Sequence, residues 1–546
     1  MFFSGNALSF YERAFRFSRL LGCSALLLLA AGCMQREPKA DLVIVNGAEP
    51  ESLDPAIITG QPDIRAVLAM FEGLTRYDPV TGNGVAGLAD RWEITPDGRT
   101  YTFHLRSNTV WSTGEPINAQ DVVYSWLRAL NPLTAADYAG QLFFVENAEE
   151  YNIGKIKDPA AVGVHAIDSR TVEVRLKSPC PFFIDLCAFP TLAVVPHKWI
   201  EAHGDRWIMQ HPVPVSGAYL LQHWRIHDKI RLRKNPLYWD AAHTLTETVD
   251  LLPIDSSTIA MNLYETAQAD IIWDKNVIPM ELMDVLRNRA DCHVFPYLGN
   301  YFFRINVTKK PLDDVRVRKA LALSIDKTRL VTRLCKAGEK PADHLTPDGT
   351  ANYDPPAGVG YNPLEARRLL AAAGFPNGHG FPTLNYLFNS SKQNEQMAIE
   401  LQEMWRKELG VHIELRQVEW KVYLSAQAIL DYDLTRSSWI ADYNDPNTFL
   451  DMWTSNNGNN RTGWKNPRYD TLLQEANHQT DLKKRATLLA QAETILIRDE
   501  LPIVPIYYWV GINFFRTNQI TGIYQNVVDE HPLSAIRKIE LHPPRR

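Results

Sequence analysis

The stretch SSWIADYNDPNTF, residues 437–449, places a lone carboxylate, Asp442, between two aromatic residues, Trp439 and Tyr443. Turn-forming acid and amide residues follow at once in NDPN, residues 444–447. Aromatic side chains mark burial or a contact surface, and a carboxylate among them is costly to desolvate unless a cation meets it. The stretch therefore predicts that a cation faces Asp442, supplied either by the fold or by a ligand.

The amino terminus is typical of a secretory signal peptide. Three arginines precede an apolar run, LLGCSALLLLAAG, which ends at residue 32 and is followed by Cys33. The run is shorter than the roughly 20 residues of a membrane-spanning helix, and a signal peptide is favoured over a buried helix. The ending LAAGC resembles the bacterial lipobox, which implies cleavage after residue 32, a lipid on Cys33 and a polar tether over residues 33–40. We therefore expect a lipid-anchored, periplasmic or otherwise extracytoplasmic bacterial protein.

The charge of the remaining chain excludes nucleic acid as an expected partner. Residues 1–32 carry three Arg and one Glu, so 54 basic residues face 62 acidic ones beyond them, a formal net charge of −8. This balance provides no basic field for nucleic acid. About 514 residues are too many for one hydrophobic core, so two or three domains are expected, in a chain interpreted as a monomer.

Enzyme signatures are absent from the sequence. It contains no GxSxG elbow, HExxH motif, P-loop or dinucleotide fingerprint between a strand and a helix, and no CxxC pair. We therefore expect no catalysis, no metal and no cofactor. Cys180 and Cys187 could form a short-loop disulfide in an oxidising compartment or remain two buried thiols.

Alternating strand-like and helix-like patterns predict an α/β fold. DLVIVNGAEPESLDP indicates a strand that runs into a loop, and NAQDVVYSWLRAL indicates a helix capped by Asn118. The stretch DVRVRKALALSIDKTRLVTRL, residues 314–334, predicts one long amphipathic helix. We expect a helix that ends at Gly410 and a strand that follows it.

Several motifs in the same order resemble one protein family. They are SLDPAIITGQPD, FEGLTRYDP, TFHLRSNTVWSTGEPINAQDVVYSWLRALNP, NPLYWD, PLDDVRVRKALALSIDK, LGVHIEL and WIADYNDPNTF. The chain resembles the oligopeptide-binding proteins of ABC importers, the family 5 extracellular solute-binding proteins, from about Asp41 to its end. The resemblance implies that a short peptide lies extended between two lobes, which close on it and dock on an inner-membrane permease.

The resemblance also implies a two-lobed periplasmic-binding-protein fold with three domains. A discontinuous domain would combine residues 41–71, 198–298 and 510–546, and residues 72–197 would form a domain inserted into it. Residues 299–509 would form the second lobe. The ligand would be enclosed between the lobes.

The family motifs imply a set of ligand-binding residues. Asp442 matches the acid that pairs with the α-amino group of the peptide, and Trp439 would wall the amine end. An internal cap or salt bridge for Asp442, and a plain core position for Trp420, are the alternatives. The expected ligand-binding residues are Asp442, Trp439, Arg436, Trp420, Tyr138, Thr59, Trp509, Ile440, Tyr443 and Arg304.

The chain departs from the family's enteric members at several of these positions. Gly299 and Ile440 stand where those members carry a disulfide, and Thr59 stands where they carry an acid. Arg436 is the one basic carboxylate anchor retained, because Gln427, Asn394 and Cys335 occupy the other places. Arg304 also replaces an acid, either as a new carboxylate anchor or as a surface charge.

Capture of short peptides for ABC import is therefore the leading interpretation. Within the same fold, murein-derived peptides or a non-peptide such as a sugar or a metal chelate are alternatives. A murein peptide also presents a free amine, so Asp442 does not distinguish it. A non-transport lipoprotein with a structural or adhesive role is the alternative of a different class.

Overall fold

The predicted alternation of strands and helices is confirmed by the computed structural model, which describes residues 37–539. The expected signal peptide (residues 1–32), Cys33 and the first part of the tether lie outside the described residues. Among residues 37–539, no helix combines the length and the apolar character that a membrane crossing requires.

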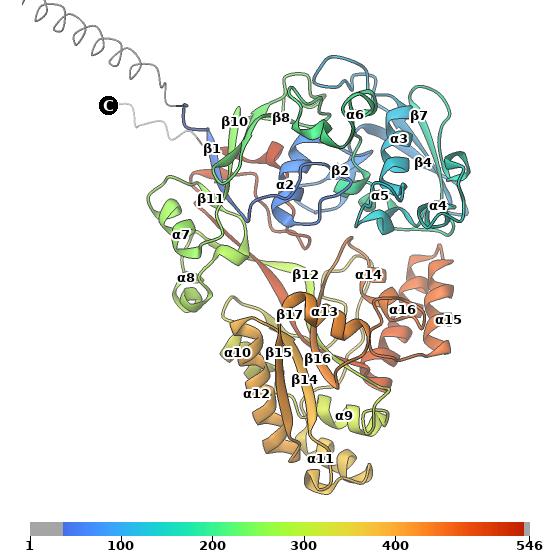
Figure 1. Ribbon diagram of the computed structural model, residues 1–546, viewed down its shortest axis with the longest axis vertical. Helices are drawn as coiled ribbons and strands as arrows, with labels where there is room; N and C mark the ends of the chain where they lie inside the picture. Colours follow the sequence, from blue (N-terminus) through green and yellow to red (C-terminus); the bar gives the residue numbers. More distant parts are fainter. Residues whose placement is uncertain (1–36, 540–546) are drawn as a thin grey trace, which may run out of the picture. The chain divides into compact units, whose positions relative to one another are not determined.

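One mixed sheet extends through most of the described chain (Figure 1). Its pairs β1–β10, β1–β11, β14–β15 and β14–β16 are parallel, and the others are antiparallel. In the order of pairing its strands are β15 (Ile413–Val418), β14 (Leu384–Asn389), β16 (Leu434–Ile440), β12 (Cys292–Ile305), β17 (Ile503–Phe515), β11 (Ile271–Ile272), β1 (Leu42–Gly47), β10 (Thr248–Pro253), β9 (Lys229–Lys234) and β8 (Tyr219–Arg225), with β13 (Lys340–Pro341) also paired with β17.

A separate antiparallel sheet of four strands forms from an early part of the chain. Its strands, in the order of pairing, are β4 (Ala89–Ile94), β5 (Thr100–Leu105), β7 (Thr171–Arg175) and β6 (Val164–Ala166). Two further sheets have two strands each: β2 (Thr75–Tyr77) with β3 (Gly84–Ala86), and β18 (Ile520–Thr521) with β19 (Arg537–Lys538).

The helices cover these sheets. They are α2 (Gln61–Met70), α3 (Ala119–Leu130), α4 (Ala148–Asn152), α5 (Phe183–Leu186), α6 (His197–His203), α7 (Ser257–Glu265), α8 (Met283–Leu286), α9 (Val315–Leu323), α10 (Lys327–Leu334), α11 (Pro363–Ala372), α12 (Lys392–Leu409), α13 (Trp420–Ala428), α14 (Asn447–Leu450), α15 (Pro467–Asn477) and α16 (Leu482–Thr494).

Four large apolar cores divide the molecule into two groups. One core packs α2 against β1 and β8–β10, and a second packs α3 against β5 and β7; we call these the first lobe. A third core packs α9 and α12 against β12 and β14, and a fourth gathers α14–α16; we call these the second lobe. The division into two lobes does not test the bounds of the three domains, which stay a prediction from the sequence.

Strands β12 and β17 belong to both lobes. Phe295 of β12 lies in the first-lobe core, whereas Phe302 and Phe303 point into the two second-lobe cores from opposite faces of the strand. The ladder pairs Pro296 with Val510 and resumes only at Asn300, opposite Tyr508. Two strands therefore connect the lobes, and their pairing lapses at the crossing.

Most of the predicted elements form where the pattern placed them. Tyr101, Phe103 and Leu105 are buried on one face of β5, and Asn118 accepts hydrogen bonds from the backbone N–H groups of Gln120 and Asp121 at the start of α3. Helix α12 ends at Gly410, which adopts a left-handed conformation (φ 69°) that glycine tolerates.

The single long helix predicted over residues 314–334 is wrong. The segment forms α9 and α10, separated at residues 324–326. Asp326 breaks the continuity because its carboxylate accepts a hydrogen bond from Arg329 N (2.9 Å) and caps a new helix.

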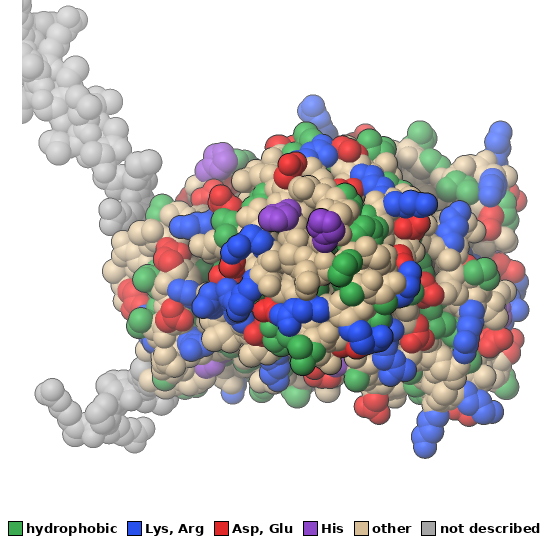
Figure 2. Space-filling view, turned by 90° about the horizontal axis from the view of Figure 1, so that it is seen from below, with side chains coloured by type: hydrophobic (Ala, Val, Ile, Leu, Met, Phe, Trp, Pro, Cys, Tyr) green, Lys and Arg blue, Asp and Glu red, His purple; other side chains and the backbone are tan. Residues whose placement is uncertain are grey.

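Basic and acidic side chains are both scattered over the face shown in Figure 2. This distribution agrees with the modest negative charge of the chain and with the absence of a basic field in the sequence.

Replacing Asp326 by Ala should lower the free energy of unfolding by about 1 kcal/mol, because the Arg329 amide at the start of α10 loses its side-chain acceptor. Urea denaturation measures the change. The exposed Asp354, which caps no helix, provides the control Asp354→Ala. Equal effects of the two substitutions would contradict the capping role.

Candidate functional site

Asp442 lies in a small pocket formed by segments of both lobes. The pocket has a volume of about 50 Å³. Asp442 and Tyr443 enter it from the loop after β16, Tyr77 and Asp185 come from the first lobe, and Tyr297 comes from the crossing segment of β12. A group bound here would contact both lobes at once.

The carboxylate of Asp442 has no cation beside it within the described chain. No ion pair involves it among residues 37–539, and its one side-chain hydrogen bond is to Gln141 of the first lobe. Burial raises the pKa of Asp442 to about 6, and the nearby carboxylate of Asp451 adds to the increase while Gln141 opposes it. The fold therefore leaves this charge to be neutralised by a proton or by a ligand.

Asp445, three residues later, differs from Asp442 because it has a cationic partner within the fold. Both of its carboxylate oxygens accept hydrogen bonds from the guanidinium of Arg485 on α16, at 2.7 and 2.8 Å. Both side chains are buried. This paired arrangement anchors the loop that carries Asp442 to the body of the second lobe.

Tyr443 joins the loop to the first lobe. Its ring stacks on Phe182 with a centroid distance of 4.0 Å and an interplanar angle of 1°, and Phe144 meets it edge to face at 6.1 Å. Tyr443 is thereby buried in the core of the first lobe although it belongs to a loop of the second.

Trp439 stands near Asp442 through a shared partner. The hydroxyl of Thr448 accepts hydrogen bonds from the Trp439 indole N–H (3.3 Å) and from the Asp442 backbone N–H (3.4 Å). Sequence reasoning missed Thr448 and Gln141, and the only sequence signal for Thr448 is its place within the same motif.

Gly299 and Ile440 are cross-strand neighbours in the β12–β16 ladder. A Cβ atom added at Gly299 would lie 3.4 Å from Ile440 Cγ1 and 3.1 Å from Trp509 Cδ1. Ile440 itself lines the Asp442 pocket, so the positions expected to lack the family disulfide do adjoin the site.

Tyr138 packs beside the Asp442 pocket, whereas Thr59 does not line it. The charge of Asp442 and, above all, burial raise the pKa of Tyr138, whose ring packs edge to face on the pocket residue Phe189 at 5.1 Å. Thr59 is exposed in the loop before α2 and does not line the pocket, which Gln61 reaches instead.

Arg436 belongs to a second, aromatic group in the second lobe. Its guanidinium lies 5.6 Å from the ring centre of Tyr301 and 5.5 Å from that of Tyr423. Among residues 37–539, its Nε is buried without a hydrogen-bond partner, as are the hydroxyl of Tyr507 and the indole N–H of Trp509. Among residues 37–539 no carboxylate forms an ion pair with Arg436, so this cation is available to an anionic ligand group.

Trp420 and Trp509 flank the aromatic group. Trp509 packs against Tyr507 and Tyr301, with centroid distances of 5.1 and 6.3 Å. Trp420 stacks on Tyr423 at 5.4 Å and remains 48% exposed. The plain-core alternative for Trp420 is therefore wrong.

Arg304 is not brought together with these residues. It is only 4% exposed, donates to Ser437 Oγ (3.1 Å) and the Asn459 carbonyl (2.6 Å), and lies over the ring of Trp453. Burial lowers its pKa to about 10. The surface-charge alternative for Arg304 is wrong, and its role as a carboxylate anchor stays a prediction.

The cysteines follow the second alternative left open by the sequence. Cys180 and Cys187 are both free and buried, so the short-loop disulfide is not present, and desolvation raises the pKa of each thiol. Cys33 lies outside the described residues. Within residues 37–539, no group of three or more His, Cys, Asp or Glu side chains is arranged to hold a metal ion.

Comparison with known proteins gives a consistent result. Residues 83–461 match the model for bacterial extracellular solute-binding proteins, family 5. The periplasmic oligopeptide-binding protein OppA of Salmonella typhimurium is 37% identical over 88% of this chain and 90% of its own length. YgiS of Escherichia coli, named a probable deoxycholate-binding periplasmic protein, is 36% identical over 89% of this chain and 91% of its own.

A solved structure confirms the predicted fold class. The murein tripeptide-binding protein MppA of Escherichia coli aligns with a TM-score of 0.76 at 33% identity, over 92% of this chain and 99% of its own. The two-lobed α/β fold of the periplasmic binding proteins is therefore the fold of this chain.

Replacing Asp445 by Asn should destabilise the protein by roughly 3–5 kcal/mol, because the buried Arg485 would lose its anion.

Replacing Asp442 by Asn should instead raise the free energy of unfolding at pH 7, by up to about 3 kcal/mol, since one pKa unit corresponds to about 1.4 kcal/mol.

The sign for Asp442 follows from its raised pKa. Because the pKa of Asp442 is raised from 3.8 to about 6, the folded state loses stability as the pH rises from about 4 to about 6 and the loss is complete above 6, whereas near pH 4 the advantage of Asn is small. Urea denaturation of both variants at pH 4 and pH 7 measures these effects. A destabilised Asp442→Asn variant at pH 7 would show that Asp442 has a cationic partner in the protein.

Proposed function

The chain belongs to the bacterial extracellular solute-binding proteins of family 5, and from this we propose that it captures short peptides between its two lobes for import by an ABC transporter. Asp442 receives the α-ammonium group of the peptide, and the closed form delivers the peptide to an inner-membrane permease. The relatives named above as binding oligopeptides and murein tripeptides support this proposal.

The contrast between Asp442 and Asp445 carries the proposal. Within residues 37–539 the fold supplies Arg485 to Asp445 and no cation to Asp442, although both carboxylates follow the same strand. A ligand ammonium would restore the missing partner, and a desolvated ion pair requires both partners to be favourable. Phe182, which stacks on Tyr443, and Gln141 contact the same loop from the first lobe, so binding there favours the closed arrangement.

The exposed edge of β16 supports an extended ligand. β12 pairs with β16 as far as Ile440, whereas β14 pairs only with Leu434 and Thr435 on the other side. The edge over Ser437–Ile440 therefore has room for an added strand, which is a common mode of peptide recognition. Arg436, at the other end of this edge from Asp442, is the proposed anchor for a carboxylate of the peptide.

We place the protein in the periplasm, as the names of its relatives indicate for them. The lipid on Cys33 and the signal peptide over residues 1–32 belong to this proposal, as does the permease. Ligand binding requires no cofactor and no catalytic residue.

Murein peptides are the second candidate ligand, because the murein tripeptide-binding protein MppA shares the fold over 92% of this chain. A murein peptide presents a free amine and would use Asp442 in the same way. A non-peptide ligand would instead leave Asp442 without its partner, as would a purely structural or adhesive role.

Trialanine with a free amino terminus should bind the wild type and lose at least about a hundredfold in affinity when Asp442 is replaced by Asn, because the ammonium then faces a neutral amide. N-acetyl-trialanine should bind the wild type weakly and the variant no worse. Isothermal titration calorimetry measures all four affinities. Equal binding of both peptides by the wild type would remove the amine-anchor role.

The affinity for trialanine should also fall as the pH falls through 6. The ammonium requires an ionised Asp442, and protonation at the raised pKa of about 6 competes with it, with a loss that approaches tenfold per pH unit well below 6. Titrations between pH 7.5 and 5 test this expectation. The residual binding of Asp442→Asn should be much less pH-dependent, and an equally steep fall in the variant would assign the effect to another group.

A further inference from the structure

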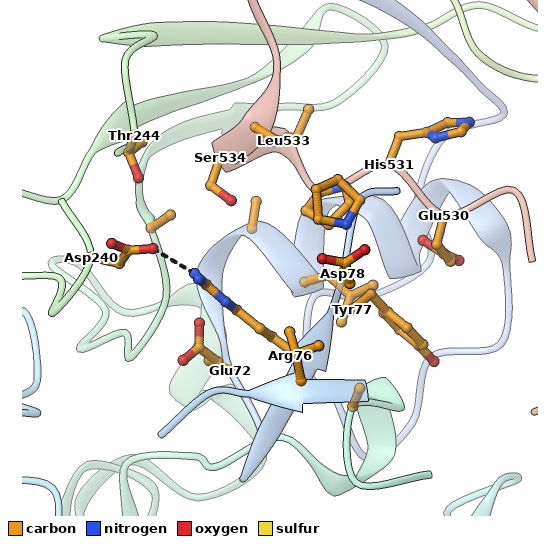
Figure 3. A pocket seen from close by; sticks show the side chains of 18 of the residues that line it. Glu72, Arg76, Tyr77, Asp78, Asp240, Thr244, Glu530, His531, Leu533 and Ser534 are labelled. Atoms are coloured by element: carbon orange, nitrogen blue, oxygen red, sulfur yellow. Dashed lines mark ion pairs between the residues drawn. The ribbon is translucent and has the colours of Figure 1, made fainter. Parts of the chain in front are cut away.

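A larger cavity lies next to the Asp442 pocket within the first lobe. Its volume is about 210 Å³. Residues of α2, of β2 and the turn after it, of the 240–244 segment and of the late segment 530–535 line it. Figure 3 shows Thr244 and Ser534 on one side of the cavity and Tyr77 and Glu530 on another.

Three deeply buried polar groups on the walls of this cavity have no hydrogen-bond partner in the part of the chain that the structure describes. They are Thr244 Oγ1, Trp273 Nε1 and His531 Nδ1, in residues that are 1%, 3% and 2% exposed. Nε2 of His531 lies 3.1 Å from Asp529 Oδ1, and in the tautomer that donates from Nε2 to Asp529 the Nδ1 atom presents its lone pair. Buried polar groups are almost always hydrogen-bonded. Thr244 Oγ1 and His531 Nδ1 can accept hydrogen bonds and point to an occupant that carries polar hydrogens, whereas the Trp273 indole N–H is a donor and requires an acceptor.

The charges on the cavity walls are not balanced. Four carboxylates, those of Glu72, Asp78, Asp240 and Glu530, face two guanidinium groups, those of Arg65 and Arg76. Arg76 pairs with Asp240 at 2.9 Å, and Glu72 accepts hydrogen bonds from Tyr238 and Trp239. Arg65 donates to two backbone carbonyls and lies 3.9 Å from Asp274.

Asp78 and Glu530 form no ion pair with any residue in the described range 37–539. One oxygen of Asp78 accepts hydrogen bonds from the Val80 and Thr81 amides of its own turn. The Glu530 side chain has no ion pair within residues 37–539; Arg65 acts on it at longer range, and burial raises its pKa to about 7. The net negative charge of the walls favours a positively charged occupant.

The cavity and the Asp442 pocket are contiguous. Tyr77 and Glu530 line both. Apolar side chains of Leu68, Ala69, Pro532 and Leu533 also line the cavity and could cover an aliphatic stem that leads to a charged end. A lysine side chain has such a form, with an ammonium group on a flexible four-carbon stem. The volume would also hold water, at about 30 Å³ per molecule, beside such a group.

We propose that this cavity is a subsite for the cationic side chain of the first residue of a bound peptide, whose ammonium group would meet Glu530 and Asp78 while its α-amino group meets Asp442. The assignment rests on the proposed function and makes it narrower: the protein prefers peptides with a basic amino-terminal residue. Two positive charges at one end of the ligand then match the unpaired carboxylates on both sides of Tyr77.

Binding of Lys-Ala-Ala and norleucine-Ala-Ala tests the assignment, because the two peptides share the aliphatic stem and differ in the charged end. Calorimetry at pH 7.5 should show that the wild type binds the lysine peptide about tenfold more tightly or better. The double variant Asp78→Asn/Glu530→Gln should lose this preference and keep its affinity for the norleucine peptide. The variant Glu475→Gln, which removes an exposed carboxylate of the second lobe, should keep the preference.

A second variant avoids dependence on the charged residues. Ser534→Phe should fill the cavity and weaken binding of the lysine peptide, with its folding checked by thermal unfolding. Equal binding of the two peptides by the wild type, or a preference that survives in both cavity variants, would overturn the assignment and leave the proposed function intact, provided that binding still depends on Asp442. Failure of the wild type to bind either peptide would refute both.

Discussion

The hydrogen-bonded pairing of β12 with β17 is the constraint on which the rest of the structure depends. Each strand contributes to a core in both lobes, so the lobes share a backbone framework as well as side-chain contacts. The ladder between the two strands is interrupted between Pro296 and Asn300, where the chain crosses from one lobe to the other. Tyr297 and Gly299 lie within the lapse, and Tyr297 borders the Asp442 pocket. The Asp442 pocket therefore adjoins the interrupted part of the ladder.

Charge separates structural from ligand-facing roles along this framework. Asp445 and Arg485 form a buried pair that the protein completes alone, whereas Asp442, Glu530 and Arg436 lack ion pairs within residues 37–539. Ionised groups taken out of water without partners are unfavourable to the folded protein. Their retention is physically reasonable when a ligand with matching charges supplies the partners, and the same groups then discriminate against ligands that lack those charges.

Much of the fold could be read from local sequence pattern, because strand alternation and helix caps act over a few residues. Asn118 and Gly410 illustrate this, and the missed break at Asp326 shows that an apolar period can continue across a new cap. The motif around Asp442 identified the loop that forms the pocket. It could not identify Gln141 or Arg485, which reach that loop from other elements, or the cavity between Tyr77 and Glu530, which joins opposite ends of the chain. Such contacts depend on tertiary packing and produce no periodic pattern in the sequence.

The hydrogen bond from Gln141 to Asp442 has a consequence for release of the ligand. An arriving ammonium group must compete with an amide that is already in place, and a departing one leaves behind a carboxylate that still has a partner. The Gln141 amide thus lowers the net affinity for the ammonium group, because the ligand replaces part of an interaction that the carboxylate already has. A carrier must release its ligand in each transport cycle, so a moderate affinity favours turnover over the tightest possible binding.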